Sequence, residues 1–419
     1  MSEREGGGGL VERREFRQAP EQEPGLLPAQ KWAWHPAVSP RLLARYYLPP
    51  QHLLLQGNAC QLLRDGVEAY PAMLEAIRSA RRFIHLETYM FIDDAVGALF
   101  GTALAEAAER GVHVRVLYDA VGSWTSRRGF FEDLRARGVD IRPFKPFSLG
   151  RGLRYLLRRD HRKILVVDGE VAFIGGVNIA AHWAPEGQGG AWRDDVMRIQ
   201  GSAVHALERR FVATWRMAFQ DRFRHWRQSR RQRRLERHEQ RGGVSLAVLS
   251  SRRSIHRAYL HAISRARRNV LVAAGYFIPD RKLVAALREA AQRGVEVSLL
   301  LPGKSDHPWL LHATRAFYEK LLTAGVRIFE WQRCVLHAKT AVVDGVWGTV
   351  GSFNLERMSL LFNHEVNAVF ADPRLGQALE ASFRSDCESC LEVELTSFRR
   401  RPFWQKLLER ALYACRRVL

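Results

Sequence analysis

Long apolar runs, a secretory leader and a dense set of cysteines are all missing from this sequence of 419 residues. No uninterrupted apolar run approaches the roughly 18 residues that a membrane-spanning helix needs. Residues 1–30 mix Glu, Arg, Gly, Gln and Pro, so we expect neither a transmembrane helix nor a signal peptide. The five cysteines are unevenly spaced, which argues against a disulfide framework. Cys387 and Cys390 have metal-like spacing but no second ligand pair nearby, and no metal role is expected.

Acidic residues are also scarce, because 44 Asp and Glu stand against 65 Lys and Arg, for a net charge of +21. Such an excess favours a polyanionic partner, either nucleic acid or an anionic membrane surface, and composition alone does not choose between them. The apolar content of 47% and the charged content of 26% are typical of a globular protein. The length allows two domains or one large duplicated domain.

Lysine is the rarer base, since only 8 of the 65 basic residues are Lys and the others are Arg. Two of these lysines stand in two copies of one motif, His161-x-Lys163-x4-Asp168 and His337-x-Lys339-x4-Asp344. A chain that otherwise uses Arg has kept a compact ammonium group at both places. The repeat therefore brings two histidines, two lysines and two carboxylates to what we expect to be one site.

The duplication extends upstream of the motif. Residues 80–94 match 266–280, residues 107–119 match 290–302, and residues 134–144 match 321–331. Each half is predicted to run helix, strand, helix, strand, helix, strand and then a hairpin that turns at Asp-Gly. Alternating strands and helices predict an α/β fold with a mostly parallel mixed sheet flanked by helices in each half.

Five regions are expected along the chain. They are a largely disordered arm at 1–45, a first half at 46–221 with its motif at 155–182, an Arg-rich helix or linker at 222–245, a second half at 246–395 with its motif at 331–358, and a basic amphipathic helix at 396–419. The Arg-rich segment is either a solvated linker or an anion-binding surface. The last helix either lies in a membrane interface or packs on its own domain.

Two histidines among lysines and amides suit chemistry at a tetrahedral phosphorus. One neutral histidine can attack phosphorus to form a phosphohistidine, while the other gives its proton to the departing alcohol and later takes one from the incoming alcohol. The candidates to hold the phosphoryl oxygens are Lys163, Lys339, Asn178 and Asn354, with Gly176 and Ser352 where the backbone approaches the ligand. These cations are side chains, so no metal or other cofactor is expected.

The carboxylates divide into two groups. An Asp before Gly in a hairpin has a sufficient structural reason, so Asp168 and Asp344 are interpreted as supports more readily than as direct catalysts. Asp194 and Glu365 occupy matching places in the repeat. A carboxylate bonded to the second nitrogen of a histidine would fix its tautomer, and these two residues suit that role.

Paired H-x-K-x4-D motifs followed by G-[GS]-x-N resemble the phospholipase D superfamily. The stretches IHLETYMFIDDAVG, LHAKTAVVDGVWGTVGSFNLE and NHEVN are similar to bacterial cardiolipin synthases, especially the B-type without N-terminal transmembrane helices. The resemblance, over roughly residues 53 to 395, implies a duplicated phospholipase D-like fold whose two pseudo-twofold-related halves share one active site at their interface. It implies transfer of a phosphatidyl group between two phosphatidylglycerol molecules, with His161 as the nucleophile and His337 as acid and base.

The resemblance also implies phosphatidylglycerol and other anionic phospholipids as partners, with peripheral attachment to the cytoplasmic face of a bacterial membrane. Because both halves lie in one chain, a monomer would suffice, and no nucleic acid partner is expected. Two departures are Glu356, where the family more often has Asp, and the short stretch after residue 400. The alternatives are a phospholipase D that releases phosphatidic acid and a nuclease of the same superfamily.

Overall fold

The computed structural model describes residues 54–146, 157–185, 192–219 and 242–414, together with Leu43, Tyr46–Leu48 and Tyr155. The predictions for most of the N-terminal arm, for most of the Arg-rich segment and for Cys415 fall outside these residues. Within them, no helix is long and apolar enough to cross a membrane.

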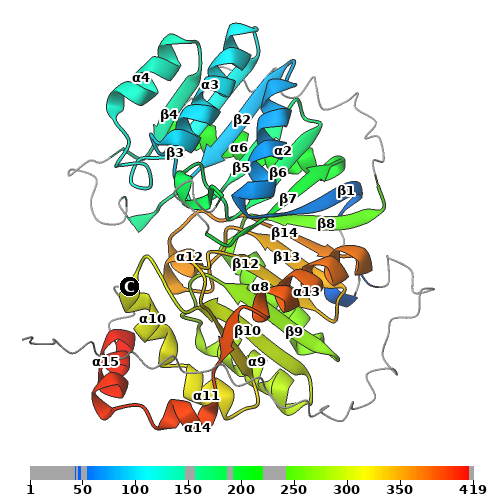
Figure 1. Cartoon of the computed structure of the whole chain (residues 1–419). Helices are drawn as coiled ribbons and strands as arrows, with labels where there is room; N and C mark the ends of the chain where they lie inside the picture. Colours follow the sequence, from blue (N-terminus) through cyan, green and yellow to red (C-terminus); the bar gives the residue numbers. More distant parts are fainter. Residues whose placement is uncertain are drawn as a thin grey trace, which may run out of the picture.

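Each half begins with a strand and continues with alternating helices and strands (Figure 1). The first half contains β1 (Leu55–Arg64), α2 (Asp65–Arg78), β2 (Phe83–Thr88), α3 (Ala95–Glu109), β3 (His113–Asp119), α4 (Arg128–Ala136), β4 (Asp140–Phe144), β5 (Ile164–Val167), β6 (Val171–Gly175), the 3-10 helix η4 (Ala181–Trp183), β7 (Asp195–Gln200) and α6 (Ser202–Phe219).

The second half repeats this order and adds helices at its end. It contains β8 (Val244–Leu249), α8 (Arg252–Arg265), β9 (Asn269–Ala274), α9 (Arg281–Gln292), β10 (Glu296–Pro302), α10 (Pro308–Arg315), α11 (Tyr318–Leu322), β11 (Arg327–Trp331), β12 (Lys339–Val343), β13 (Trp347–Gly351), α12 (Arg357–Leu361), β14 (Asn367–Ala371), α13 (Pro373–Cys387), β15 (Cys390–Glu392), α14 (Leu395–Arg399) and α15 (Phe403–Ala414).

One sheet of 15 strands runs through both halves in the order β15-β11-β10-β9-β12-β13-β14-β8-β1-β7-β6-β5-β2-β3-β4. The halves are joined where β1 pairs antiparallel with β8. Among the described strands, β2, β3 and β4 pair parallel with one another, as do β9, β10 and β11. The α/β duplication is as predicted, but "mostly parallel" is right only for the strands that helices connect. The motif hairpin and the strands after it pair antiparallel.

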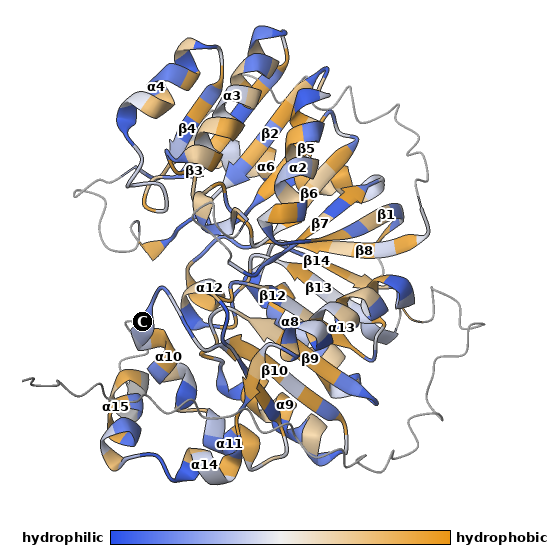
Figure 2. Cartoon of the chain, viewed as in Figure 1, coloured by the Kyte–Doolittle hydropathy of each residue, from blue (hydrophilic) through white to orange (hydrophobic). Residues whose placement is uncertain are grey.

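The central strands are apolar at nearly every position because helices cover both faces of the sheet. In β5, Leu165 and Val167 face a core that includes α2 and α3, whereas Ile164 and Val166 face a second core that includes α6 and α13. This second core contains residues of both halves. Figure 2 shows the result as apolar strands beneath helices whose polar residues gather on their outer faces.

The motif hairpins turn at Asp-Gly, as predicted. Asp168 and Gly169 have φ of 55° and 74°, and Asp344 and Gly345 have φ of 55° and 64°. These left-handed conformations suit Asp and Gly. The strand that enters each turn starts at or just after the motif lysine, because β5 begins one residue after Lys163 and β12 begins at Lys339. The residues before each strand are thus free to pair with the other half.

Candidate active site

Two segments, each carrying a motif histidine, meet where the halves join. The backbone N–H of His161 donates to the carbonyl of His364, at 3.0 Å, and the N–H of His337 donates to the carbonyl of Arg193, at 2.8 Å. Each motif histidine therefore lies against the other half of the chain. Both are buried, with 8% and 5% of their surface exposed.

Each histidine ring contacts a carboxylate from the opposite half. Nδ1 of His337 lies 2.6 Å from Oδ2 of Asp194. Nδ1 of His161 lies 3.2 Å from both carboxylate oxygens of Glu365 and 3.2 Å from the carbonyl of Ser352. A carboxylate at Nδ1 favours the tautomer with its proton there and leaves the lone pair on Nε2. The pairing of Asp194 and Glu365 with histidines agrees with the sequence prediction, which had not assigned a partner to either.

The two carboxylates are themselves held in place by side chains of their own half. Trp183 donates its indole N–H to Asp194, at 3.2 Å, and Ser359 donates its hydroxyl to Glu365, at 2.7 Å. Trp183 and Ser359 each stand five residues after the motif asparagine, so they occupy the same place in the repeat. Neither residue was predicted from the sequence, because Trp and Ser are unlike residues and only their matching offset could have identified them.

Gly176 and Ser352 also occupy matching places and serve the carboxylates differently. A Cβ atom on Gly176 would lie 2.1 Å from Oδ1 of Asp194, so only glycine leaves room for that carboxylate. Ser352 instead donates its hydroxyl to Glu365, at 2.5 Å. In this structure both residues therefore position a carboxylate. Their predicted approach to a phosphate stays a prediction.

The motif lysines lie beside the histidines. Nζ of Lys163 donates to the carbonyl of His161, at 2.7 Å, and Nζ of Lys339 lies 2.8 Å from Nδ1 of His337. The second contact is not a hydrogen bond when Nδ1 carries its proton, because both groups would be donors. Burial, together with the charge of the other lysine, lowers the pKa of Lys163 to about 7. Burial lowers that of Lys339 to about 8, so an anion that restores charge to these lysines is bound favourably.

Burial and the neighbouring lysines also lower the pKa of both histidines. Both rings are therefore neutral in the free site near pH 7. Aromatic rings border them, with Tyr89 centred 5.2 Å from His161 and Trp183 centred 5.2 Å from His337. These rings pack against the two histidines in edge-to-face contacts.

The motif asparagines are both buried, with 2% of Asn178 and 3% of Asn354 exposed. Oδ1 of Asn178 accepts the backbone N–H of Met90, at 3.1 Å. Oδ1 of Asn354 has no partner among the residues that the structure describes. Their role toward phosphoryl oxygens remains a prediction, and the N–H groups of both amides are the donors that it would use.

The aspartates of the motif lie at the hairpin turns, where backbone amides surround them. Asp168 accepts three N–H groups, those of residues 81, 82 and 83, each at 2.8 Å. Asp344 accepts the N–H groups of residues 267, 268 and 269 and the hydroxyl of Tyr47. These contacts tie each hairpin to the start of β2 or β9 and support the interpretation of both residues as structural.

Replacing Asp344 by alanine is expected to lower the free energy of unfolding by about 2–3 kcal/mol, because buried N–H groups lose a charged acceptor. Asp168→Ala should cost less, since that carboxylate is more exposed. Urea denaturation would measure both changes, and Asp344→Asn serves as the control that keeps one acceptor oxygen. A variant of unchanged stability but lost activity would contradict the structural role.

Other candidate ligands are accounted for by packing. Cys387 and Cys390 are free thiols packed against the second core. Among the described residues, no group of three or more His, Cys, Asp and Glu side chains could hold a metal ion. Glu356, the departure from the family pattern, accepts the N–H groups of residues 358 and 359 and so caps α12.

The chain is similar to known proteins over most of its length. The family model described as cardiolipin synthase, PLD-like domain, matches residues 73–187 and 259–387. The cardiolipin synthase of Geobacillus thermodenitrificans is 34% identical over 392 residues, which cover 93% of this chain and 78% of the relative. The major cardiolipin synthase of Bacillus subtilis is 32% identical over 360 residues, covering 84% and 74%.

The fold has neighbours among solved structures. Phosphatidylserine synthase of Haemophilus influenzae superposes with a TM-score of 0.66 at 13% identity, over 88% of this chain and 97% of that chain. Polyphosphate kinase of Porphyromonas gingivalis gives 0.54 at 16% identity, over 86% and 53%. These neighbours confirm the predicted fold, and the matched family and relatives confirm the resemblance found in the sequence. The chain belongs to the cardiolipin synthase family of phospholipase D-like phosphatidyltransferases.

Proposed function

We propose that this cardiolipin synthase joins two phosphatidylglycerol molecules through a phosphohistidine at His161. The observation that carries the proposal is the crossed arrangement, in which each buried histidine has its Nδ1 on a carboxylate of the other half and its Nε2 left for chemistry. Two lysines of lowered pKa beside these rings favour an anionic phosphodiester. No residue of a second chain is needed, so a monomer suffices.

In the first step, Nε2 of His161 attacks phosphorus of one phosphatidylglycerol and the bond from phosphorus to the headgroup glycerol breaks. His337, protonated once the phosphodiester lies beside it, gives its proton to the departing glycerol oxygen. In the second step, the glycerol hydroxyl of another phosphatidylglycerol attacks phosphorus and passes its proton to Nε2 of His337. The phosphorus–nitrogen bond breaks, which releases cardiolipin and restores His161.

Lys163 and Lys339 are proposed to stabilise the phosphoryl oxygens in both steps, with Asn178 and Asn354 as further donors. These side chains supply the positive charge that a metal would otherwise provide, so we propose a metal-independent reaction. Asp194 and Glu365 would hold the rings and stabilise each imidazolium as it forms.

The lipid products of the purified protein test this function. Vesicles of phosphatidylglycerol should yield cardiolipin and glycerol in equal amounts, measured by mass spectrometry. Phosphatidic acid without cardiolipin would show that water, not a lipid alcohol, resolves the intermediate, and would establish a hydrolytic phospholipase D instead. Cleavage of DNA or RNA by the wild type but not by His161→Ala would favour the nuclease.

Peripheral attachment to the membrane is proposed to involve α15, which contacts α10. The helix buries one side, including Glu409 at 4% exposure, and leaves its apolar side open, with Phe403 77% and Trp404 62% exposed. The two sequence alternatives for this helix are therefore compatible. Trp309 of α10, 45% exposed, adds an aromatic side chain beside it. Apolar and aromatic residues on a basic chain suit an anionic lipid surface, for which we propose the cytoplasmic face of the cell membrane.

The double variant Phe403→Ser, Trp404→Ser is expected to bind phosphatidylglycerol vesicles at least about tenfold more weakly, because two large side chains no longer enter the interface. Cosedimentation at several salt concentrations would measure this. Val67→Ser is the matched control, since Val67 is 54% exposed in the first half. Equal binding by the double variant would exclude α15 as an anchor.

A further inference from the structure

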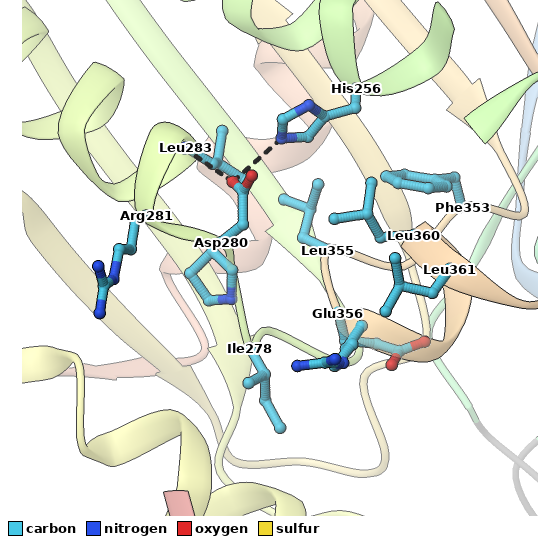
Figure 3. Close-up of a pocket in the computed structure, with 12 residues that line it drawn as sticks. His256, Ile278, Asp280, Arg281, Leu283, Phe353, Leu355, Glu356, Leu360 and Leu361 are labelled. Carbon is cyan, nitrogen blue, oxygen red and sulfur yellow. Dashed lines mark hydrogen bonds and ion pairs between the residues drawn. The ribbon is translucent and has the colours of Figure 1, made fainter. Parts of the chain in front are cut away.

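A cavity of about 340 Å³ lies in the second half, behind the loop that carries Asn354. Helix α8, the start of α9 and α12 enclose it (Figure 3). Its apolar walls are formed by Ile278, Leu283, Phe353, Leu355, Leu360 and Leu361. This volume is within the range of small-ligand sites, and no step of the proposed reaction uses it.

The first half shows how the same fold closes this space. The ungapped match of 80–94 with 266–280 places Tyr70 where the second half has His256. The buried Tyr70 ring donates its hydroxyl to the carbonyls of Asn178 and Ala180, at 2.8 and 2.9 Å, and so contacts the loop after the motif directly. The smaller His256 makes no such contact and bonds Asp280 instead, at 3.1 Å.

The N-cap residues of α3 and α9 differ in the same way. Asp94, which caps α3, also accepts the N–H of Ala181, at 2.7 Å, and ties that helix to η4. Its counterpart Asp280 caps α9 but is bonded to His256 of α8. Nothing comparable ties α9 to α12 among the described residues. In the part of the chain that the structure describes, only the second half has this cavity, although both halves carry the same motif. The cavity is therefore not needed for the motif itself, which indicates a separate role such as ligand binding.

The lining chemistry indicates an alkyl chain that carries an anionic head. Leu361 is 41% exposed and places an apolar side chain where the cavity meets solvent. Arg281 and Arg357 are cationic members of the lining. The carboxylates in the lining, Asp280 and Glu356, already accept backbone N–H groups at the starts of α9 and α12. Nε of Arg357 is buried without a partner among the described residues. An unpaired buried donor is costly unless a ligand satisfies it.

The cavity shares its walls with the catalytic machinery. Phe353 and Leu355 flank Asn354 in sequence and line the cavity. Helix α12 supplies Leu360 and Leu361 to the cavity, while Ser359 of the same helix bonds Glu365, which contacts His161. A chain in the cavity therefore packs against the segment that positions the nucleophile.

We propose that this cavity receives part of one acyl chain of the acceptor phosphatidylglycerol, whose own phosphate is not the one attacked and lies toward Arg281 and Arg357. The inference rests on the proposed function for the identity of the lipid. The second half would then select substrates by the length of the acyl chain, whereas Tyr70 fills the corresponding space in the first half.

His256→Tyr tests the proposal because it copies the residue that closes the first half. The KM for long-chain phosphatidylglycerol in mixed micelles should rise about tenfold, because a few methylene groups of the acyl chain would no longer be buried. For dibutanoyl phosphatidylglycerol, whose chains are too short to fill the cavity, KM should be unchanged. His256→Gln is the matched control that leaves the space open. Equal KM values for His256→Tyr and His256→Gln at every chain length would overturn the proposal.

Leu361→Glu is a second variant, chosen because an exposed position tolerates the change. It places a carboxylate at the opening and should raise KM for long chains in the same selective way. Leu99→Glu is its control, since Leu99 is 45% exposed in α3. If Leu361→Glu and His256→Tyr both changed KM equally for long and short chains, the cavity would have no role in substrate binding.

A readout independent of turnover uses phosphatidylglycerol with a photoactivatable group at the end of one acyl chain. Labelled peptides from the full-length protein should include residues 353–361 or 278–283, and His256→Tyr should remove that label. Labelling of α15 alone would overturn the cavity assignment. Cavity labelling with unchanged KM in His256→Tyr would overturn its assignment to a substrate.

The proposed function fails separately, if the wild-type protein makes no cardiolipin. That result does not depend on which residues are labelled.

Discussion

Replacing either His161 or His337 by alanine is expected to lower the rate of cardiolipin formation at least about 10³-fold. No neighbouring side chain can replace His161 as the nucleophile or His337 as acid and base. Lipid binding should survive in both variants, since the exposed apolar residues of α15 are untouched. Mass spectrometry of the lipid products and vesicle cosedimentation would measure the two properties separately. Unchanged turnover in both variants would end the proposed mechanism.

The two histidines can be told apart by the leaving group. A substrate that releases p-nitrophenol needs no proton from an acid, so His337→Ala should regain much of its first-step rate with it, whereas His161→Ala should not. His337→Ala should also accumulate the phosphohistidine, because the incoming alcohol lacks its base. Intact-protein mass spectrometry would detect the added mass. Rescue of His161→Ala and not of His337→Ala would reverse the two roles.

The crossed carboxylates give the second large effect. Asp194→Asn and Glu365→Gln are each expected to reduce turnover about 10²–10⁴-fold with little change in KM, because an amide no longer fixes the tautomer or stabilises the imidazolium. The structure further predicts which histidine each variant disables. Asp194→Asn should behave as a weaker His337→Ala and be relieved by the p-nitrophenol leaving group, whereas Glu365→Gln should not be relieved.

Double variants make this assignment stringent. Asp194→Asn should add little to His337→Ala, because the carboxylate acts through the ring that is already gone. Glu365→Gln should likewise add little to His161→Ala. A carboxylate that acted on the histidine of its own half would give the opposite pattern of rescue and additivity. Circular dichroism would confirm that each variant is folded.

Many residues of this site could be predicted because they occur at matching positions in the two halves. The Asp-Gly turns and the duplicated α/β order follow from local sequence and were confirmed. The matching places of Asp194 and Glu365 follow from the repeat, and their role toward the histidines stays a prediction. The extent of parallel pairing was overestimated, since the order of helices and strands says nothing about how the hairpin strands pair with their neighbours. Trp183 and Ser359 were missed because their identities differ although their contacts are the same.

The cavity could not be predicted either, because an empty space depends on the sizes of residues from three separate elements. His256 and Tyr70 match in the repeat, but only the contacts of the Tyr70 hydroxyl show what the substitution leaves open. The predictions for the Arg-rich segment and for most of the N-terminal arm fall outside the described residues and stay predictions.

Local sequence was enough to predict chemistry at phosphorus and to name the candidate histidines and lysines, because the H-x-K-x4-D motif occurs once in each half. Which carboxylate contacts which histidine depends on how the two halves pack. The pairing of β1 with β8 joins the halves into one sheet, and the backbone bonds of His161 to His364 and of His337 to Arg193 cross between them. Contacts between residues more than a hundred positions apart depend on how the halves pack, and no local pattern records that packing.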